Sequence, residues 1–225
     1  MQTLFNSTHT KPSTQRSKVW QYIRRTQDLK LTLEAKNQET SLCVYSDATW
    51  GDDPDSRTSQ SGYICYLFGS PVSWNSCRQR SITYSSTEAE LNPLVDSFHE
   101  GIWLKSLINE IWKLQIDSAN HFIDDSELNK QLTVDDETFK KEYCTTHYID
   151  NKGLDDKLKK FGSNSKTRHI DLRTKGIRQE IKAQNIKIVL VKTKEMIADG
   201  LTKPAPMSTL SKLIRTIDPV FPISA

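Results

Sequence analysis

The sequence predicts an α/β fold in which a mixed β-sheet carries helices on its faces. Three β-rich segments follow one another with short connections in the first third of the chain, which is typical of an antiparallel meander. A long amphipathic segment comes next, and the later strand-like runs are separated by helical segments. Helical crossovers join parallel strands, so antiparallel and parallel pairs are expected in one sheet.

The meander is predicted over residues 41–76. Its first strand, SLCVYSD at 41–47, is β-rich and ends in an acid, and the turn-rich stretch GDDPDSRTSQSG follows it. The next two strands, GYICYLFG at 62–69 and SPVSWNS at 70–76, are separated only by a Gly-Ser step. That short step is typical of a hairpin.

The segment that begins with SSTEAEL is predicted as a long helix ending near Trp112, because its apolar residues recur at helical spacing. Ser or Thr followed by Glu three positions later is a capping-box pattern. Ser85 with Glu88 fits this pattern, and so does Thr87 with Glu90. The helix start therefore offers two glutamates, and capping needs only one of them.

The second half of the chain is predicted to contain two more strands with helices between them. Residues 115–145 are acidic and polar and lack an apolar stripe, so they are interpreted as an inserted loop with a short helix. The run IKIVLV is almost continuously apolar, as expected of a strand covered on both faces. The remaining elements are a strand at 147–150 (HYID), helices at 151–161 and 167–183, the strand IKIVLV at 186–191, and an interrupted helix from 195.

The N-terminal residues and the composition exclude several classes of protein. Residues 18–25 suggest a short helix and 29–33 a strand, and no apolar run indicates a secretory signal or a membrane span. The four cysteines form no CxxC pair, so a zinc site is not indicated, and a reducing, intracellular setting is expected. A net charge of +3 does not identify a partner.

Four acids fall at comparable places in the predicted fold. Asp47 and Asp150 end strands, while Glu90 and Asp199 lie near the starts of helices. In α/β sheets these positions converge on one edge. Two like charges 4 Å apart repel by about 4 kcal/mol at an intermediate dielectric, so such a cluster needs shared protons or cations. Carboxylate oxygens suit Mg²⁺ or Mn²⁺, and two such ions form a clamp for phosphodiester hydrolysis.

Seven motifs carry a resemblance to a known family. SDATW, RTSQSGY, VSWNSCRQ, SSTEAEL, YIDN, TRHID and IADGLTKP occur in this order. Together they resemble the ribonuclease H domain at the C-terminus of the Pol polyprotein of copia-type LTR retrotransposons. The resemblance implies a ribonuclease H-like fold, a five-stranded mixed sheet with helices on both faces. It divides the chain into a connecting segment from the end of reverse transcriptase at 1–40, the ribonuclease H-like domain at 41–217 with its polar insert at 115–145, and a C-terminal tail at 218–225.

The resemblance also implies an activity and a site. Asp47 of SDATW, Glu90 of the AEL segment, Asp150 of YIDN and Asp199 of IADGLTK match the family's catalytic and metal-binding acids. The expected reaction is hydrolysis of the RNA strand of an RNA–DNA hybrid with two Mg²⁺ ions, for which Mn²⁺ can substitute. One ion activates water and the other stabilises the leaving 3′-oxygen.

Contacts to the nucleic acid are expected from two groups of residues. Polar side chains flank the acids, and basic residues crowd one helical segment, which either forms a solvated helix face or follows the phosphates. Selectivity for RNA would come from 2′-hydroxyl contacts across the wide minor groove. The candidates are Ser46, Thr87, Asn151, Lys166, Arg168, Arg173, Lys175 and Arg178.

Several alternatives remain open at the level of sequence. Glu88 is expected to cap the helix while Glu90 turns to the metals, and Asp124 or Asp125 of HFIDD is an alternative third acid. A decayed Pol remnant would keep the fold and at most bind nucleic acid. An integrase or transposase fits the meander and the ADGLTK ending less well, and no Asp-Thr/Ser-Gly triplet supports an aspartic protease.

The partners and location implied by the resemblance are those of a polyprotein segment. They are the RNA–DNA hybrid and the reverse transcriptase and integrase parts of the same polyprotein, with no membrane. The expected location is intracellular, in a cytoplasmic virus-like particle, with the nucleus as a second compartment.

Overall fold

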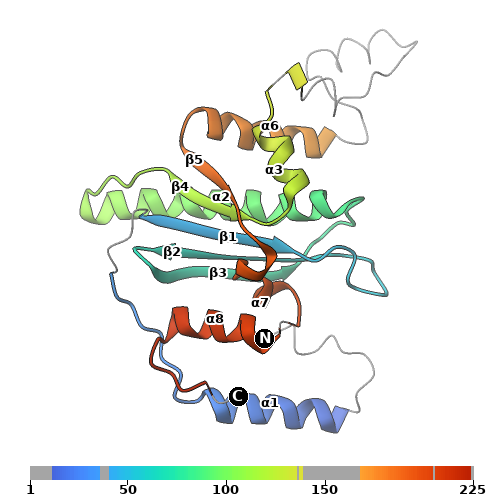
Figure 1. The fold of residues 1–225 in the computed structure, drawn as a ribbon, viewed down its shortest axis with the longest axis vertical. Coiled ribbons are helices and arrows are strands. Elements are labelled where there is room, and N and C mark those ends of the chain that lie inside the picture. Colours follow the sequence, from blue (N-terminus) through green and yellow to red (C-terminus); the bar gives the residue numbers. More distant parts are fainter. Residues whose placement is uncertain (1–11, 36–40, 136, 139–167, 205, 224–225) are drawn as a thin grey trace.

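A five-stranded sheet forms the centre of the protein (Figure 1). The computed structural model describes residues 12–35, 41–135, 137–138, 168–204 and 206–223. The strands lie in the order β3-β2-β1-β4-β5. Their bounds are β1 (Leu42–Ala48), β2 (Gln60–Leu67), β3 (Ser70–Arg78), β4 (Ala119–Ile123) and β5 (Ile186–Leu190).

The sheet is mixed, as the sequence predicts. β1, β2 and β3 pair antiparallel as a meander, whereas β1 pairs with β4 and β4 with β5 in parallel. The turn between β2 and β3 places Phe68 at φ 47° and Gly69 at φ 84°. Two successive residues with positive φ match the twist of a tight hairpin, so the local chain conformation sets this strand pairing.

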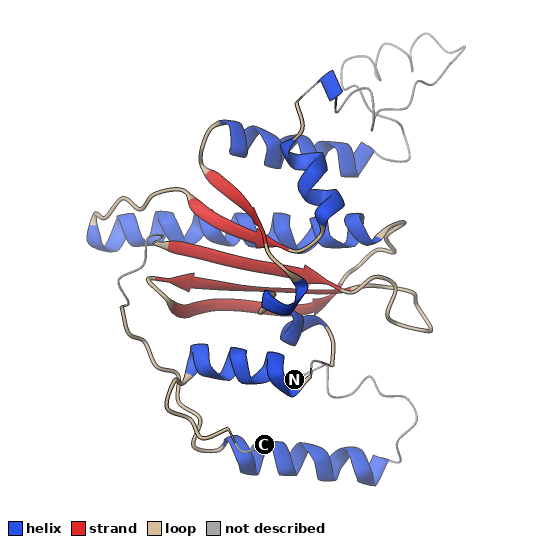
Figure 2. Ribbon diagram, viewed as in Figure 1, coloured by secondary structure: helices blue, strands red, loops and turns tan. Residues whose placement is uncertain are grey.

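Helices cover both faces of the sheet, which confirms the predicted architecture (Figure 2). On one face lie α2 (Ser86–Trp112), α3 (Ser126–Thr133) and α6 (Arg168–Lys182). On the other face lie α7 (Asp199–Thr202) and α8 (Met207–Ile217), which follow the short 3-10 helix η2 (Thr193–Glu195). α1 (Pro12–Thr26) lies beyond α8, on the side away from the sheet.

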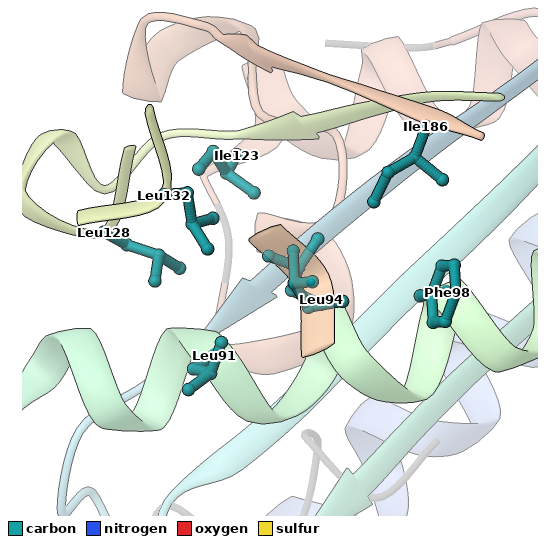
Figure 3. Packing of buried hydrophobic residues seen from close by; sticks show 8 residues of the cluster. Leu91, Leu94, Phe98, Ile123, Leu128, Leu132 and Ile186 are labelled. Carbon is teal, nitrogen blue, oxygen red and sulfur yellow. The ribbon is translucent and has the colours of Figure 1, made fainter. Parts of the chain in front are cut away.

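The main hydrophobic core joins α2, α3, α6 and the parallel strands (Figure 3). Leu91 and Leu94 of α2 are almost fully buried, as are Ile123 of β4 and Leu128 of α3. Full burial of such a side chain stabilises a fold by about 1.5–3 kcal/mol. α3 is therefore part of the core, although its eight residues offer only a short apolar stripe.

The predicted inserted loop at 115–145 is wrong for residues 119–123, which form β4, whereas the short helix predicted within it is present as α3. β4 supplies the central parallel strand, with Ala119, His121 and Ile123 buried in alternation, and α3 follows it. Only five residues carry this two-residue period, and polar neighbours on both sides obscure it. The predicted HYID strand at 147–150 and the helix at 151–161 lie outside the described residues.

The segment at 29–33 was predicted as a strand, but it does not join the sheet. It runs instead along the domain, where the Thr32 N–H donates to the Ile217 carbonyl at 2.8 Å and the Lys30 N–H donates to Asp218 Oδ2 at 3.1 Å. The end of α8 thus pairs with the segment that follows α1. Among the described residues, no helix has the length and apolar character needed to span a membrane.

Candidate active site

Asp47 is the centre of a cluster of acids at one edge of the sheet. It lies near the end of β1, opposite Gly62 of β2, and only 2% of its surface is exposed. The Thr202 hydroxyl donates a hydrogen bond to Asp47 Oδ2 from α7. β1 and α7 meet here because α7 packs on the face of β1, β2 and β3.

Two further aspartates complete a group with metal-ligand spacing. Asp124 directly follows β4, and Asp199 is the first residue of α7. One carboxylate oxygen from each of Asp47, Asp124 and Asp199 lies within 4.8 Å of the others. The pairing of β1 with β4 explains the encounter, because the carboxyl ends of parallel neighbours reach the same edge of a sheet.

Glu90 reaches the same place from the first turns of α2. Its side chain is 9% exposed and accepts a hydrogen bond from the Ala48 backbone N–H at the end of β1. Burial, together with the charges of Asp47 and Asp124, raises the pKa of Glu90 to about 9. That effect places Glu90 within electrostatic reach of Asp47 and Asp124.

Glu88 has the other role expected at this helix start. The Ser85 hydroxyl caps α2 by accepting the Glu88 backbone N–H at 3.1 Å, and Glu88 Oε2 accepts the Tyr84 N–H at 2.6 Å. The capping box is thus present, except that Glu88 accepts the backbone N–H of Tyr84, the residue before the N-cap Ser85. Glu88 serves the helix end and Glu90 faces the acids, which answers the ambiguity of SSTEAEL.

The electrostatics of the cluster favour proton or cation uptake. Burial is the main cause that raises the pKa of Asp47 to about 7, and the neighbouring Asp199 and Asp124 add to it. Burial and Asp199 likewise raise the pKa of Asp124. The ionised acids are therefore poorly solvated, and a bound cation would relieve that cost.

Lys203 is a cation already placed beside this cluster. Its Nζ lies 2.7 Å from Asp199 Oδ1 and 3.9 Å from Asp47 Oδ2. Burial opposes its charge, but the hydrogen bond to Asp199 and the nearby acids raise the pKa of Lys203. One ammonium does not neutralise four carboxyl groups once they are ionised, and hard oxygen donors of this kind suit Mg²⁺ or Mn²⁺.

Among the described residues, Asp124 is the acid that lies with Asp47 and Asp199. Asp150, which the YIDN motif predicts, lies outside the described residues. Asp125 caps α3, accepting the Leu128 backbone N–H at 2.6 Å, and so belongs to the helix start. The segments HFID, which ends in Asp124, and HYID, which ends in Asp150, share the pattern His-aromatic-Ile-Asp. The sequence therefore contains two candidates for this acid with the same local pattern.

Two predicted nucleic-acid contacts do not hold. Ser46 is only 1% exposed and lies within β1, so it offers no surface to a ligand. Arg178 is 5% exposed, and its guanidinium donates to the carbonyls of Gln131 at 2.5 Å and Val134 at 2.6 Å. Arg178 thus satisfies carbonyls at the end of α3, a structural use of charge that no local pattern reveals.

The remaining predicted contacts are placed differently. Arg173 is exposed on α6 and donates to Asn92 Oδ1 of α2. Thr87 and Lys175 are half-buried. Arg168 is the first residue of α6, and Asn151 and Lys166 lie outside the described residues.

Gln79, from the motif VSWNSCRQ, is a site residue that sequence reasoning missed. Its side chain is buried, and its Nε2 donates to Ser61 Oγ at 2.8 Å and to the Ala89 carbonyl at 2.9 Å. Asn92 Nδ2 donates in turn to Gln79 Oε1 at 2.8 Å. This network joins β2, the residue after β3 and the start of α2, so it holds the turn that carries Glu90.

Gly62 permits the contact that brings α7 to Asp47. A Cβ at Gly62 would lie 2.7 Å from Leu201 Cβ and 2.9 Å from Thr202 Cγ2, both too close for real atoms. We expect Gly62→Ala to push α7 away from β2, to cost about 1–3 kcal/mol of stability and to weaken Mn²⁺ binding. Thermal unfolding and Mn²⁺ titration calorimetry measure the two effects.

Gly176→Ala provides the matched control for that substitution. Nothing lies within 4 Å of a Cβ at Gly176, which is inside α6, so alanine there is expected to preserve or slightly raise stability. Wild-type metal binding by Gly62→Ala would contradict the assigned role of the glycine.

The sheet order, the helices on both faces and the carboxylates at the sheet edge define a ribonuclease H-like fold. The chain matches no protein-family profile. Among solved structures, LC11-RNase H1, isolated from compost by a metagenomic approach, aligns with a TM-score of 0.44 and 12% identity over 72% of this chain and 93% of its own.

Curated relatives identify the family. The chain is 30% identical over 200 residues, or 89% of its length, to the retrovirus-related Pol polyprotein from transposon RE2 of Arabidopsis thaliana. It is 30% identical over 72% of its length to the corresponding polyprotein from transposon TNT 1-94 of Nicotiana tabacum. The chain belongs to the Pol polyproteins of copia-type retrotransposons. It spans 12% and 10% of the lengths of these two relatives.

Proposed function

We propose that the protein is a ribonuclease H that hydrolyses the RNA strand of RNA–DNA hybrids. The observation that carries this proposal is the approach of Asp47, Asp124 and Asp199 carboxylate oxygens to within 4.8 Å of one another. Glu90 supports it, because its buried carboxylate is coupled to two of these acids. Such a group has little structural value by itself, since its members repel one another.

Asp47, Glu90, Asp124 and Asp199 would hold the divalent cations, Mg²⁺ or Mn²⁺. Two such ions, when bound, activate the attacking water and stabilise the leaving 3′-oxygen. The chain's own groups orient these ligands. Thr202 fixes one oxygen of Asp47, and the Ala48 N–H fixes Glu90.

Substrate contacts are proposed on the side of α6. Arg173 donates to Asn92, and Asn92 is two residues after Glu90 in the sequence. The exposed guanidinium of Arg173 can therefore meet a phosphate close to the cleavage position. Thr87 lies on the first turn of α2, three residues before Glu90, and is proposed as a polar contact to the substrate. Lys175, Arg168 and Lys166, from the basic segment of the sequence, remain proposed contacts, and so does Asn151, which was predicted to flank the acids.

The biological setting is proposed from the relatives, which are Pol polyproteins from transposons. In that setting the substrate is the hybrid made during reverse transcription. The partners are the reverse transcriptase and integrase parts of the same polyprotein, and the place is a cytoplasmic virus-like particle with later access to the nucleus.

Cleavage of an end-labelled RNA–DNA hybrid, compared between wild type and Asp47→Asn, tests the proposal. We expect cleavage of the RNA strand only, dependent on Mg²⁺ or Mn²⁺, and a loss of at least about 1,000-fold in the variant. Circular dichroism establishes that both proteins are folded. Hybrid binding without cleavage by the folded wild type would favour the second candidate, a decayed remnant that only binds nucleic acid.

A further inference from the structure

Two exposed aromatic side chains lie at the edge of the sheet that carries the acids. Trp50 is 57% exposed and Tyr84 is 85% exposed, although large aromatic side chains normally gain by burial. Neither residue belongs to a helix or a strand: Trp50 follows β1, and Tyr84 precedes α2. We call this pair the aromatic platform.

Hydrogen bonds hold Trp50 in place. The indole Nε1 of Trp50 donates to the Thr83 carbonyl at 3.1 Å, which fixes the ring while leaving its surface open. The next residue, Gly51, donates its N–H to Ser59 Oγ at 3.1 Å, and Ser59 Oγ also bonds Thr83 Oγ1 at 3.2 Å. Ser59 and Thr83 are buried, so the exposed ring rests on a rigid support.

The platform is close to the acids along both chain segments. Trp50 is three residues after Asp47, and three residues span at most about 10 Å. Tyr84 donates its backbone N–H to Glu88, which lies two residues before Glu90. The bond between the Ala48 N–H and Glu90 ties these two segments together beside the cluster.

The chemistry of the platform complements that of the acids. A negatively charged cluster repels a phosphodiester backbone, so contacts close by that do not depend on the substrate's charge add to those made by cations and by Arg173. Aromatic faces provide such contacts, because they stack on the flat faces of nucleotides with little dependence on sequence. A fixed ring also loses little conformational freedom on binding.

We propose that Trp50, assisted by Tyr84, binds a nucleotide of the substrate next to the scissile phosphate and positions the strand at the acids. This rests on the proposed function and names a substrate contact for the same site. The ring would stack on the base of an unpaired nucleotide, or pack against the sugar of a paired one, because the base faces of a duplex are covered by their neighbours. The nucleotide belongs either to the paired hybrid or to an unpaired strand that leaves it.

The test measures hybrid binding by Trp50→Ala, Trp50→Phe and Trp112→Ala. Trp112 is the control: it is 67% exposed and ends α2, a 27-residue helix about 40 Å long, so it lies far from the acids. Fluorescence anisotropy of a labelled hybrid in Ca²⁺ gives the dissociation constants. Blunt hybrids and hybrids with a single-stranded overhang separate the two sources of the nucleotide, and melting temperatures establish folding.

We expect Trp50→Ala to weaken hybrid binding about 5- to 20-fold and Trp112→Ala to leave it unchanged. Trp50→Phe should retain most of the affinity, because it keeps a flat face and loses only the bond to Thr83. A loss confined to overhang substrates assigns an unpaired nucleotide, and a loss on both assigns a paired one. Mn²⁺ affinity should not change in any of the three variants.

Two results would overturn the inference. Unchanged hybrid affinity in Trp50→Ala, or an equal loss in Trp112→Ala, would remove the platform from the substrate path while leaving the proposed nuclease intact. A wild type that binds no hybrid at all would instead defeat the proposed function, and with it the inference.

Discussion

Asp124→Asn is expected to abolish metal-dependent cleavage of the hybrid, whereas Asp150→Asn is expected to leave it nearly unchanged. An Asp124 oxygen lies within 4.8 Å of ligand oxygens of Asp47 and Asp199, and Asn in its place removes a negative ligand at the centre of the site. Loss of such a ligand corresponds to at least about 4 kcal/mol of transition-state stabilisation, or about 1,000-fold in rate.

Asp125→Asn is the matched control for this prediction. Asparagine caps helices about as well as aspartate, so the bond to the Leu128 N–H survives and both stability and cleavage should stay close to wild type. Initial cleavage rates in Mg²⁺ and in Mn²⁺ measure the effect for the three variants. Loss of activity in Asp150→Asn with retention in Asp124→Asn would reverse the assignment of the third acid.

The metal-free protein is expected to lose stability as the pH rises from about 5 to 8. The pKa of Asp47 is about 7 in the fold against an ordinary value of 3.8, and that of Glu90 is about 9 against 4.5. The folded state therefore binds more protons than the unfolded chain over this range, so unfolding becomes easier as protons are removed. Most acids that form ion pairs behave in the opposite way.

Bound divalent cations should reverse this loss of stability at higher pH, and Asp47→Asn should remove part of the loss. At pH 8 the neutral side chain is expected to raise the free energy of unfolding of the metal-free protein by about 1–3 kcal/mol. The same variant should lose the stabilisation that Mg²⁺ gives the wild type by mass action. Urea unfolding at pH 5, 6.5 and 8, with EDTA or with Mg²⁺, measures both effects. A metal-free wild type whose stability rises toward pH 8 would refute the assigned pKa values.

The elements that the sequence predicted well are those with local signals. β1 and β3 were predicted within two residues at each end, since turn-rich segments bound them and the Phe68–Gly69 turn joins β3 to β2. The start of α2 followed from the Ser85 cap, which depends on residues four positions apart at most. Each of these signals lies within one turn or one hairpin.

Local sequence signals predicted only part of the candidate active site. The motifs pointed to Asp47, Glu90 and Asp199, and the structure brings Asp47 and Asp199 together with Glu90 alongside. The choice between Asp124 and Asp150 was different, because HFID and HYID carry the same local pattern. Pairing of β4 with β1 placed Asp124 at the cluster, and strand pairing is a property of the sheet.

By itself, the sequence determined the mixed α/β architecture, the family and the acids in its distinctive motifs, since these depend on local periodicity and on residue types in order. The tertiary structure alone decided which charged groups meet. It buried Arg178 against the end of α3, brought Lys203 to Asp199 and Asp47, and left Trp50 exposed. Burial and charge proximity arise from segments distant in the chain, so no short stretch of sequence contains them.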